Sequence, residues 1–356
     1  MSTATFEQNT RVNSLIKAWE EIQKAKPETR IRNAAQELNV SELELLATRA
    51  GEDCIRLTGN WPEFVKRLPE LGPVMSLTRN ESCILEHKGT FDEVSTFGEG
   101  SRAMATVLGP IESRMFFKSW FVGFAVKMEK RNRTLHSVQI FDHAGEAITK
   151  IYLQEDSHWE AYETLIRDFS SPDQGKLQEV TPYPEEIYAE EIDQEAFLED
   201  WKNLKDTHAF FGMLRKYKVH RYDAMHLAEG HFTFQLPKAS VRQLLQRASG
   251  QKLPIMIFTG NRGNIQIHQD IVRTIRVIER ESAVWLNVLD PTFNMHLRED
   301  HIASVWVVKK PTEDGVVTSV EIYDDNKVLI AQFFGLRKPG NPELKEWVEL
   351  VDQLQP

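Results

Sequence analysis

Apolar residues follow two different spacings along this chain, and the change between them predicts its elements. Residues 12–26 and 30–51 carry apolar side chains at intervals of three and four, which predicts helices. From Val74 the apolar residues fall into short runs separated by turn signals such as Asp142-His-Ala-Gly145, which predicts a meandering antiparallel sheet. The predicted strands are 74–77, 82–88, 90–95, 103–108, 119–128, 135–141 and 147–153, and a helix at about 155–169 follows them.

The second half of the chain repeats the first at a shift of 181 or 182 residues. The matching residues are Thr78 and Thr259, Asn80 and Asn261, Ile84 and Ile265, His87 and His268, Val107-Leu108-x-Pro110 and Val288-Leu289-x-Pro291, and Ser137-Val138-x-Ile140-x-Asp142 and Ser319-Val320-x-Ile322-x-Asp324. Such a repeat predicts two copies of one fold. The expected class is therefore α+β with an internal duplication: two similar halves, each with a large antiparallel sheet and flanking helices, the last helix at 342–354.

Two stretches without periodicity separate the halves. Ser170-Ser-Pro-Asp-Gln-Gly175 and Thr181-Pro-Tyr-Pro-Glu-Glu186 are rich in turn formers, and a long acidic stretch leads out of them. A chain of 356 residues is also long enough for two domains of ordinary size. We therefore predict an N-terminal repeat at 1–172, a connector at 173–190 and a C-terminal repeat at 191–356.

A histidine interrupts an apolar helical pattern at the start of the second half. Phe197, Trp201, Leu204, His208 and Phe211 follow one another at steps of three and four, so one continuous helix would align all five. His208 would then point where a core residue points. Two interpretations stay open at this stage: a hydrogen-bonded core histidine, or a ligand of a bound metal complex.

Cations crowd the end of the same helical pattern. Arg215, Lys216, Lys218 and Arg221 suit a helix C-terminus and are also able to bind the carboxylates of a ligand. An imidazole above an apolar platform, with cations at the rim, suits a flat, hydrophobic, dianionic metal complex such as heme.

The duplication helps to separate residues of the fold from residues of a site, because the fold is shared by both halves. His208 has no histidine counterpart in the first half, and Arg114 has Met295 as its counterpart in the second. His87 and His268 do correspond, so we expect them to be structural. Arg114 is either a surface arginine with a packed stem or a donor toward a ligand on the His208 helix.

Charge and composition disfavour several functional classes. A formal net charge of -10 argues against a broad nucleic-acid surface, and no apolar run reaches the roughly 20 residues of a membrane helix. Without such a run or a visible N-terminal signal, we expect a cytoplasmic location. Cys54 and Cys83 lack metal-ligand spacing, so we expect reduced thiols.

A structural or regulatory protein that binds DNA or a partner is the rival hypothesis. Residues 30–51 have a helix-turn-helix cadence, with Ser41 as the cap of the second helix. That second helix carries Glu42 and Glu44, which is the wrong charge for a major groove.

The remaining candidates are weaker. Gly260-Asn-Arg-Gly263 lies between strand-like runs and is not followed by a helix, so we interpret it as a hairpin turn and not a phosphate loop. Lys309, Lys310 and Arg337 end or follow strands, where they are either solvated or available to a ligand carboxylate.

Several segments together resemble the HemS/ChuS family of hemin-handling proteins of Gram-negative heme uptake, from about residue 14 to the C-terminus. The segments are Trp201-x4-Asp206-Thr-His208-x-Phe210-Phe211-x2-Leu214-x2-Tyr217-x3-Arg221, Arg79-Asn80-Glu81-x5-Glu86-His87-x-Gly89-Thr90-Phe91, Ser137-Val-Gln-Ile-Phe-Asp-His143, Gly260-Asn-Arg-Gly-x-Ile-Gln-Ile267, Asn287-x2-Asp290-Pro-Thr-Phe293-x2-His-Leu297 and Lys310-Pro-Thr-x-Asp-Gly315.

The resemblance implies roles for individual residues. His208 matches the proximal iron ligand, and Arg114 matches the arginine that reaches the distal face from the first half. Arg221, Lys310 and Arg337 match basic residues around the heme edge. One position departs from the family: Phe334 stands where a tyrosine is frequent, so a hydroxyl near the heme is missing.

The resemblance leaves two activities open. Some family members look like non-canonical heme oxygenases, which open the macrocycle and release iron when given electrons and dioxygen. Others resemble carriers that pass heme to a separate oxygenase. The implied partners are heme and, depending on the activity, a reductase, a heme ABC importer or a heme oxygenase, with the protein acting as a monomer or homodimer.

Overall fold

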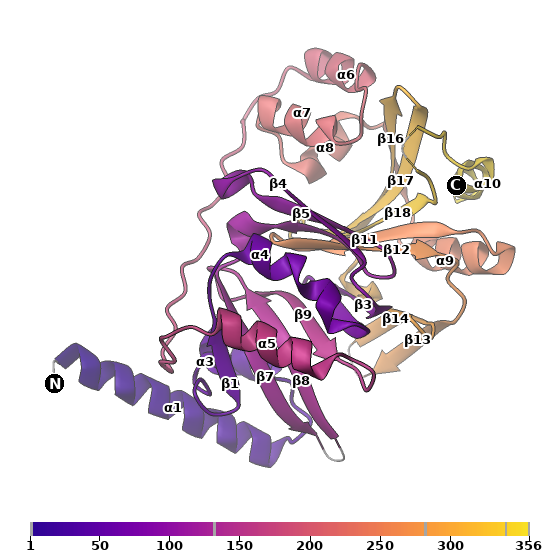
Figure 1. Ribbon diagram of the computed structural model, residues 1–356. Coiled ribbons are helices and arrows are strands. Elements are labelled where there is room, and N and C mark those ends of the chain that lie inside the picture. The colour runs from indigo at the N-terminus through magenta and orange to yellow at the C-terminus, as the bar shows by residue number, and fades with distance from the viewer. Residues whose placement is uncertain (1–2, 131–132, 281–282, 339, 355–356) are drawn as a thin grey trace. The chain divides into compact units, whose positions relative to one another are not determined.

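The computed structural model describes residues 3–130, 133–280, 283–338 and 340–354 (Figure 1). The chain divides into two compact units. Unit 1 comprises Met1–Thr78, His87–Pro184 and Asn261–Ile265, and unit 2 comprises Arg79–Glu86, Glu185–Gly260 and Gln266–Pro356. Each unit thus includes a short segment from the other half of the sequence, which the predicted division at residues 172 and 191 did not anticipate. Among the described helices, none is long and apolar enough to cross a membrane.

The same order of elements occurs twice: three helices, a strand, a helix, eight strands and a final helix. The first set is α1 (Thr3–Ala25), α2 (Ile31–Glu37), α3 (Glu42–Ala47), β1 (Cys54–Leu57), α4 (Trp61–Lys66), β2 (Val74–Arg79), β3 (Cys83–Gly89), β4 (Glu93–Phe97), β5 (Met104–Leu108), β6 (Glu112–Phe116), β7 (Val122–Lys130), β8 (Arg133–Phe141), β9 (Ala147–Leu153) and α5 (Trp159–Phe169). The second set is α6 (Gln194–Lys202), α7 (Ala209–Tyr217), α8 (Arg221–Leu227), β10 (Thr233–Leu236), α9 (Ser240–Gln251), β11 (Ile255–Gly260), β12 (Asn264–Asp270), β13 (Ile275–Arg280), β14 (Ala283–Leu289), β15 (Phe293–Arg298), β16 (Ser304–Thr312), β17 (Gly315–Tyr323), β18 (Leu329–Gly335) and α10 (Lys345–Asp352).

The strands form two antiparallel sheets of nine. Their orders are β1-β7-β8-β9-β2-β3-β15-β14-β13 and β10-β16-β17-β18-β11-β12-β6-β5-β4, which are equivalent strand by strand under the duplication. The expected α+β fold with two similar halves is therefore confirmed. Gly260-Asn-Arg-Gly263 joins β11 to β12, with the Asn261 N–H donating to the Asn264 carbonyl, as its interpretation as a turn predicted.

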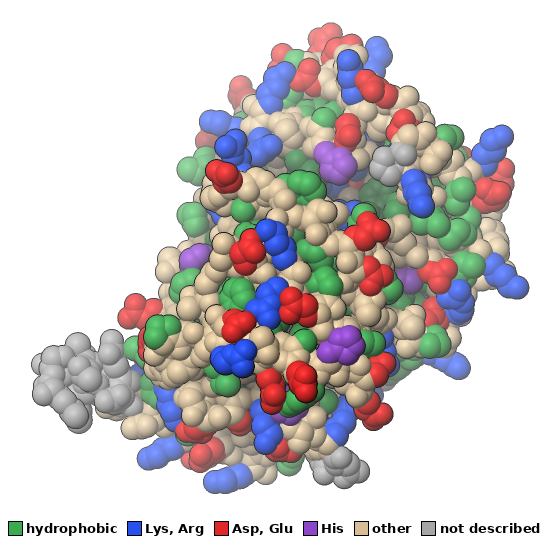
Figure 2. Space-filling view, in the orientation of Figure 1, with side chains coloured by type: hydrophobic (Ala, Val, Ile, Leu, Met, Phe, Trp, Pro, Cys, Tyr) green, Lys and Arg blue, Asp and Glu red, His purple; other side chains and the backbone are tan. Residues whose placement is uncertain are grey.

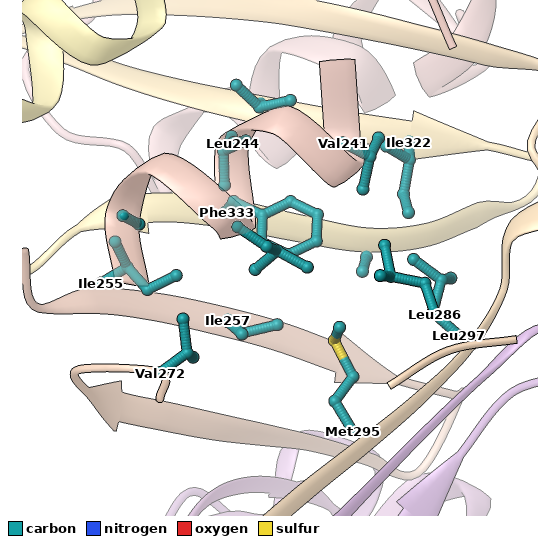
Figure 3. Close-up of a cluster of buried hydrophobic side chains, with 14 of the residues drawn as sticks. Val241, Leu244, Ile255, Ile257, Val272, Leu286, Met295, Leu297, Ile322 and Phe333 are labelled. Atoms are coloured by element: carbon teal, nitrogen blue, oxygen red, sulfur yellow. The ribbon is translucent and has the colours of Figure 1, made fainter. Parts of the chain in front are cut away.

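In unit 2, the strands β16, β17 and β18 have apolar side chains on both faces. Val305, Val307, Val320, Ile322 and Phe333 pack on one face with residues of α9 and α10, and Figure 3 shows the Phe333 ring among the aliphatic side chains of this core. The intervening positions point to the other face, because side chains alternate along a strand. There Trp306, Val308 and Tyr323 pack with residues of α6, α7 and α8.

The pattern at 30–51 forms two helices, α2 and α3, as its helix-turn-helix cadence predicted, and Asn39, with a φ of 54°, lies in the turn between them. Ser41 then caps α3: its hydroxyl accepts from the Glu44 backbone N–H, and the Glu44 carboxylate accepts from the Ser41 N–H. This reciprocal arrangement is a capping box, so the predicted role of Ser41 is confirmed.

The prediction of one continuous helix through Trp201 and His208 is wrong. Helix α6 ends at Lys202, and α7 begins only at Ala209. The Asn203 side chain bonds back to the Glu199 carbonyl at 2.8 Å, and the Asp206 carboxylate accepts from the His208 backbone N–H at 2.6 Å. These side chains supply local partners to backbone groups at the end of one helix and the start of the next, which competes with continuation of the helix.

Candidate functional site

His208 lies at the N-terminus of α7, and its side chain is 91% exposed. The expectation that it points into the core is therefore wrong, and the interpretation as a buried core histidine is wrong with it. Ring atom Nδ1 of His208 lies 2.6 Å from Oδ1 of Asp206. The imidazole is thus held by a neighbouring carboxylate while most of its surface is open to solvent.

Helix α7 explains why the side that carries His208 is exposed. Phe210, Met213 and Leu214 are buried against α6, α8 and the sheet, so they define the inner side of the helix. Phe211 is 54% exposed, and a Cβ added at Gly212 would meet no atom within 4 Å. We call the surface formed by His208, Phe211 and Gly212 the α7 outer face. It combines an imidazole with an exposed aromatic ring.

Arg221 and Lys310 lie inside unit 2 and share one carboxylate, that of Glu321. Arg221 binds it in a bidentate manner, with Nε 2.9 Å from Oε2 and Nη2 2.7 Å from Oε1. Lys310 Nζ lies 3.0 Å from Oε1. Glu321 is fully buried and Lys310 is 3% exposed, so the interpretation of Lys310 as a solvated strand end is wrong.

Three neutral side chains complete the surroundings of Glu321. Tyr323 donates its hydroxyl to Oε2 at 2.8 Å, while Ser319 and Gln332 donate to Oε1 at 3.2 Å and 2.9 Å. The strands place these groups together, because Glu321 lies opposite Gln332 in the register of β17 and β18. A buried carboxylate with this many donors satisfies its hydrogen-bonding capacity inside the protein.

The protonation states of this group follow from its charges. Burial favours the neutral acid of Glu321, but the charges of Arg221 and Lys310 outweigh it and hold the pKa of Glu321 well below its usual range. Burial lowers the pKa of Lys310, and the nearby Arg221 charge opposes the effect of Glu321. With Arg221 and Lys310 charged, the cluster of two cations and one anion has a net charge of +1.

Aromatic rings connect this cluster to α7. The Arg221 guanidinium lies 5.2 Å from the ring centroids of both Phe210 and Phe211, and Lys310 Nζ lies 4.8 Å from that of Phe210. Cations at these distances are attracted by the negative face of a ring. The structure thus brings Arg221 and Lys310 beside the α7 helix that carries His208.

Arg337 and Phe334 also belong to unit 2. Arg337 Nη2 lies 3.4 Å from Asp314 Oδ2, and its Nε is buried and has no hydrogen-bond partner among the described residues. The charge of Arg337 is one of the influences on Asp206, whose pKa lies below its usual value chiefly because the His208 backbone N–H donates to it. Phe334 is half-buried on β18, with its ring centroid 5.1 Å from that of Phe258.

Arg114 is in unit 1, on strand β6. Its Nη2 lies 2.8 Å from Glu112 Oε1, and its Nη1 donates to the carbonyls of Ser113 and Val107 at 3.1 Å and 3.4 Å. The side chain is 30% exposed. Its predicted reach toward a ligand of His208 stays a prediction.

The corresponding histidines His87 and His268 are both buried, at 5% and 6% exposed. The His268 ring stacks on Phe293, with centroids 3.7 Å apart, and burial lowers its pKa to about 4. A buried neutral imidazole packed on a phenyl ring fits the structural role that we expected for this position.

The helix-turn-helix segment does not present an exposed recognition helix. All six residues of α3 are buried, and Glu42 and Glu44 form ion pairs with Lys150 and Arg11. A recognition helix must present side chains to base edges, which this packing prevents. Figure 2 shows acidic and basic side chains interspersed over the visible face, without a continuous basic surface there.

Sequence reasoning missed two residues, Asp206 and Glu321. Glu321 has Gln139 as its counterpart in the first half, so the comparison of halves that selected His208 and Arg114 would also have selected it. Asp206 stands two residues before His208, but spacing alone did not indicate that its carboxylate contacts the ring.

Comparisons with known proteins agree with the duplication. The model of the family described as "Haemin-degrading HemS.ChuX domain" matches residues 39–169 and 218–354. The hemin transport protein HemS of Yersinia enterocolitica is 31% identical over 325 residues, which cover 91% of this chain and 92% of that protein.

Two solved structures are similar over nearly the whole chain. The heme-binding protein PhuS of Pseudomonas aeruginosa, in its heme-bound form, has a TM-score of 0.92 at 39% identity and covers 97% of this chain and 99% of its own. The heme degrading enzyme ChuS of Escherichia coli O157:H7 has a TM-score of 0.88 at 29% identity, covering 97% and 100%. With both halves matched by the domain model, the chain belongs to the haemin-degrading HemS/ChuX family.

Proposed function

We propose that this protein binds heme in bacterial hemin utilisation, with His208 as the axial ligand of the iron through Nε2. The observation that carries the proposal is the α7 outer face, which combines the exposed imidazole of His208 with the exposed ring of Phe211 three residues along the chain. Neutral imidazole is a common iron ligand, and an aromatic surface suits a porphyrin. HemS, PhuS and ChuS, to which this chain is similar, are named for hemin transport, heme binding and heme degradation.

The basic residues of unit 2 would hold the propionates at the heme edge. Arg221 and Lys310 share only one carboxylate, so their cluster keeps a net positive charge next to α7. Arg337 adds a third cation, with a buried Nε that lacks a partner among the described residues. Carboxylates bind arginine through charge-assisted hydrogen bonds, so these groups fit an anionic ligand edge. Phe334 would contribute apolar contact only.

Arg114 would act on the opposite side of the heme from His208. Its guanidinium already donates to the Glu112 carboxylate and the Ser113 carbonyl of β6 and to the Val107 carbonyl of β5, which holds it in one orientation. A fixed cationic donor at this side would bond to water or oxygen on the iron. Removing it should change ligand binding at the iron more than it changes heme affinity.

We further propose that the protein degrades heme, with transfer to a separate oxygenase as the alternative. Heme would supply the iron at which dioxygen is reduced, while the protein supplies ligation, orientation and a distal donor. Degradation needs an electron donor such as a reductase, whereas carriage needs a receiving oxygenase. Either role places the protein in the cytoplasm, where it would accept heme from an importer.

An absorption titration with hemin tests the binding site. Wild-type protein should give a saturable Soret band, and His208→Ala should shift that band and weaken binding. His231→Ala replaces another exposed histidine of unit 2 and is the matched control. An unchanged spectrum and affinity in His208→Ala would rule out His208 as the ligand.

Turnover separates the two activities. The heme complex receives ascorbate or a reductase system in air, with catalase present to remove peroxide. Loss of the Soret band with formation of a ring-opened product would establish degradation. A band that survives, together with protein-dependent transfer of heme to an oxygenase, would establish a carrier.

A further inference from the structure

Asp206 contacts His208 in two ways. One oxygen, Oδ1, lies 2.6 Å from the backbone nitrogen of His208 and 2.6 Å from ring atom Nδ1. The backbone carbonyl of Asp206 also accepts from the Ala209 N–H at 3.2 Å. The residue therefore fixes both the start of α7 and the ring at that start.

The contact determines which ring nitrogen is available. A carboxylate has no hydrogen to donate and only accepts hydrogen bonds, and Oδ1 of Asp206 lies within hydrogen-bonding distance of Nδ1 of His208. Nδ1 must then carry the hydrogen that it donates to Oδ1. The lone pair of the neutral ring is on Nε2, which points away from the carboxylate.

The loop that carries Asp206 is anchored at several points. The Glu313 N–H donates to the Lys205 carbonyl at 3.1 Å, which ties the loop to the turn between β16 and β17. At the other end, Asn203 bonds to the Glu199 carbonyl. These contacts anchor the loop just before Asp206, whose own side chain is 63% exposed.

We propose that Asp206 is a positioning residue that orients the His208 imidazole toward iron and makes it a stronger electron donor. The proposal rests on His208 being the axial ligand. A carboxylate that accepts from the outer nitrogen of a ligating histidine fixes the ring and raises its basicity. A porphyrin over the α7 outer face would exclude water from this pair, and a hydrogen bond is stronger where the dielectric is low.

The consequence concerns the iron. A more basic axial ligand stabilises the ferric state relative to the ferrous state, because hydrogen bonding around the ligand is one of the means by which a protein adjusts heme potential. Asp206 should therefore lower the reduction potential of bound heme and strengthen the bond between iron and His208.

Two substitutions of Asp206 separate its contact with the His208 backbone from its contact with the ring. Asp206→Asn keeps a side-chain oxygen that accepts from the His208 backbone N–H, but removes the charge. Asp206→Ala removes both functions. Asp200→Asn is the matched control, because Asp200 is an acid of α6 whose hydrogen-bond partners among the described residues are Lys216 and Tyr217 and do not include His208.

The measurements are the iron–histidine stretching frequency of the ferrous complex by resonance Raman, the heme reduction potential and the hemin Kd. In Asp206→Asn, the frequency should fall and the potential should rise. In Asp206→Ala, the hemin Kd should also increase about tenfold. Asp200→Asn should match the wild type in all three.

The outcomes are distinguishable. A frequency and potential unchanged in Asp206→Asn, with a normal iron–histidine band, would overturn the role of Asp206 while leaving His208 as the ligand. Absence of an iron–histidine band in the wild-type complex would overturn the proposed ligation, and the inference about Asp206 with it.

Discussion

Arg221 and Glu321 form a bidentate ion pair inside unit 2, with N···O distances of 2.9 Å and 2.7 Å. The pair joins α8 to strand β17, and Lys310 of the neighbouring strand β16 binds the same carboxylate. The packing of α8 on the sheet and the positions of Arg221 and Lys310 thus depend on Glu321. The energetic consequence follows from burial, because an unpaired charge inside a protein is costly.

Replacing Glu321 should therefore destabilise the protein strongly. Glu321→Ala leaves two cations without their buried counter-ion, and we expect a loss of about 3–5 kcal/mol in the free energy of unfolding. Urea denaturation monitored by tryptophan fluorescence measures it. Asp223→Asn is the control. Asp223 lies on α8, as Arg221 does, but its ion pair with Lys327 is exposed, so the substitution should cost less than about 1 kcal/mol. Equal losses in the two variants would contradict the importance of the buried cluster.

Stability should fall on acidification because of His268. Its pKa is about 4 in the folded protein against an ordinary value of 6.5, so the unfolded chain binds more protons between these values. The contribution is fully present above pH 6.5 and is lost as the pH falls toward 4, reaching at most about 3 kcal/mol. His268→Asn should flatten the difference in unfolding free energy between pH 7 and pH 4.5. His231→Ala should leave this pH dependence of the unfolding free energy as in the wild type. An unchanged pH dependence in His268→Asn would refute the role of His268 in the loss of stability on acidification.

Gly212→Ala should affect the stability of the free protein and its affinity for hemin in opposite directions. In the free protein a Cβ at this exposed helical position meets no atom within 4 Å, so Gly212→Ala should stabilise the chain by about 0.5–1 kcal/mol. A porphyrin on the α7 outer face would meet the added methyl group, which should weaken hemin binding by about 1–3 kcal/mol. Gly250→Ala, in the last part of α9 and equally open, should raise stability without changing the hemin Kd. If Gly212→Ala binds hemin normally, the ligand does not lie on this face.

Phe334→Tyr tests whether a hydroxyl at this position strengthens hemin binding. Phe334 is half-buried, so a hydroxyl should change the unfolding free energy by less than about 0.5 kcal/mol. If the added hydroxyl reaches a propionate, hemin affinity should rise by about 1 kcal/mol, or roughly fivefold. Phe258→Tyr makes the same change on the neighbouring strand, at the ring in contact with Phe334. A slower release of hemin in Phe334→Tyr but not in Phe258→Tyr is the expected result.

The prediction of the fold from the sequence succeeded where the signal was repeated. Identities such as Asn80 with Asn261 keep one order over most of the chain, and the two sets of elements correspond one to one. The short exchanges of Arg79–Glu86 and Asn261–Ile265 between the units were not predicted. Each segment includes a turn between two strands, and the sequence of a hairpin does not indicate with which compact unit its turn packs.

The prediction of the site was less complete. His208 was identified as a candidate, but its surroundings were wrong, because apolar spacing continues across the break between α6 and α7. Periodicity records the order of side chains and does not record a carboxylate that captures a backbone N–H. Asp206 has this effect here, and the same carboxylate also contacts the exposed ring of His208.

The sequence by itself determined the duplicated α+β fold, the cap at Ser41 and the residues that differ between the halves, because these depend on local spacing and on comparison within the chain. Only the tertiary structure decided that His208 is exposed and that Arg221 and Lys310 are buried on Glu321. The physical reason is that Arg221 of α8 lies 100 residues from Glu321 of β17 in the chain, and Lys310 reaches the same carboxylate across the pairing of β16 with β17. Their pairing depends on strand register and helix packing, which no local pattern encodes.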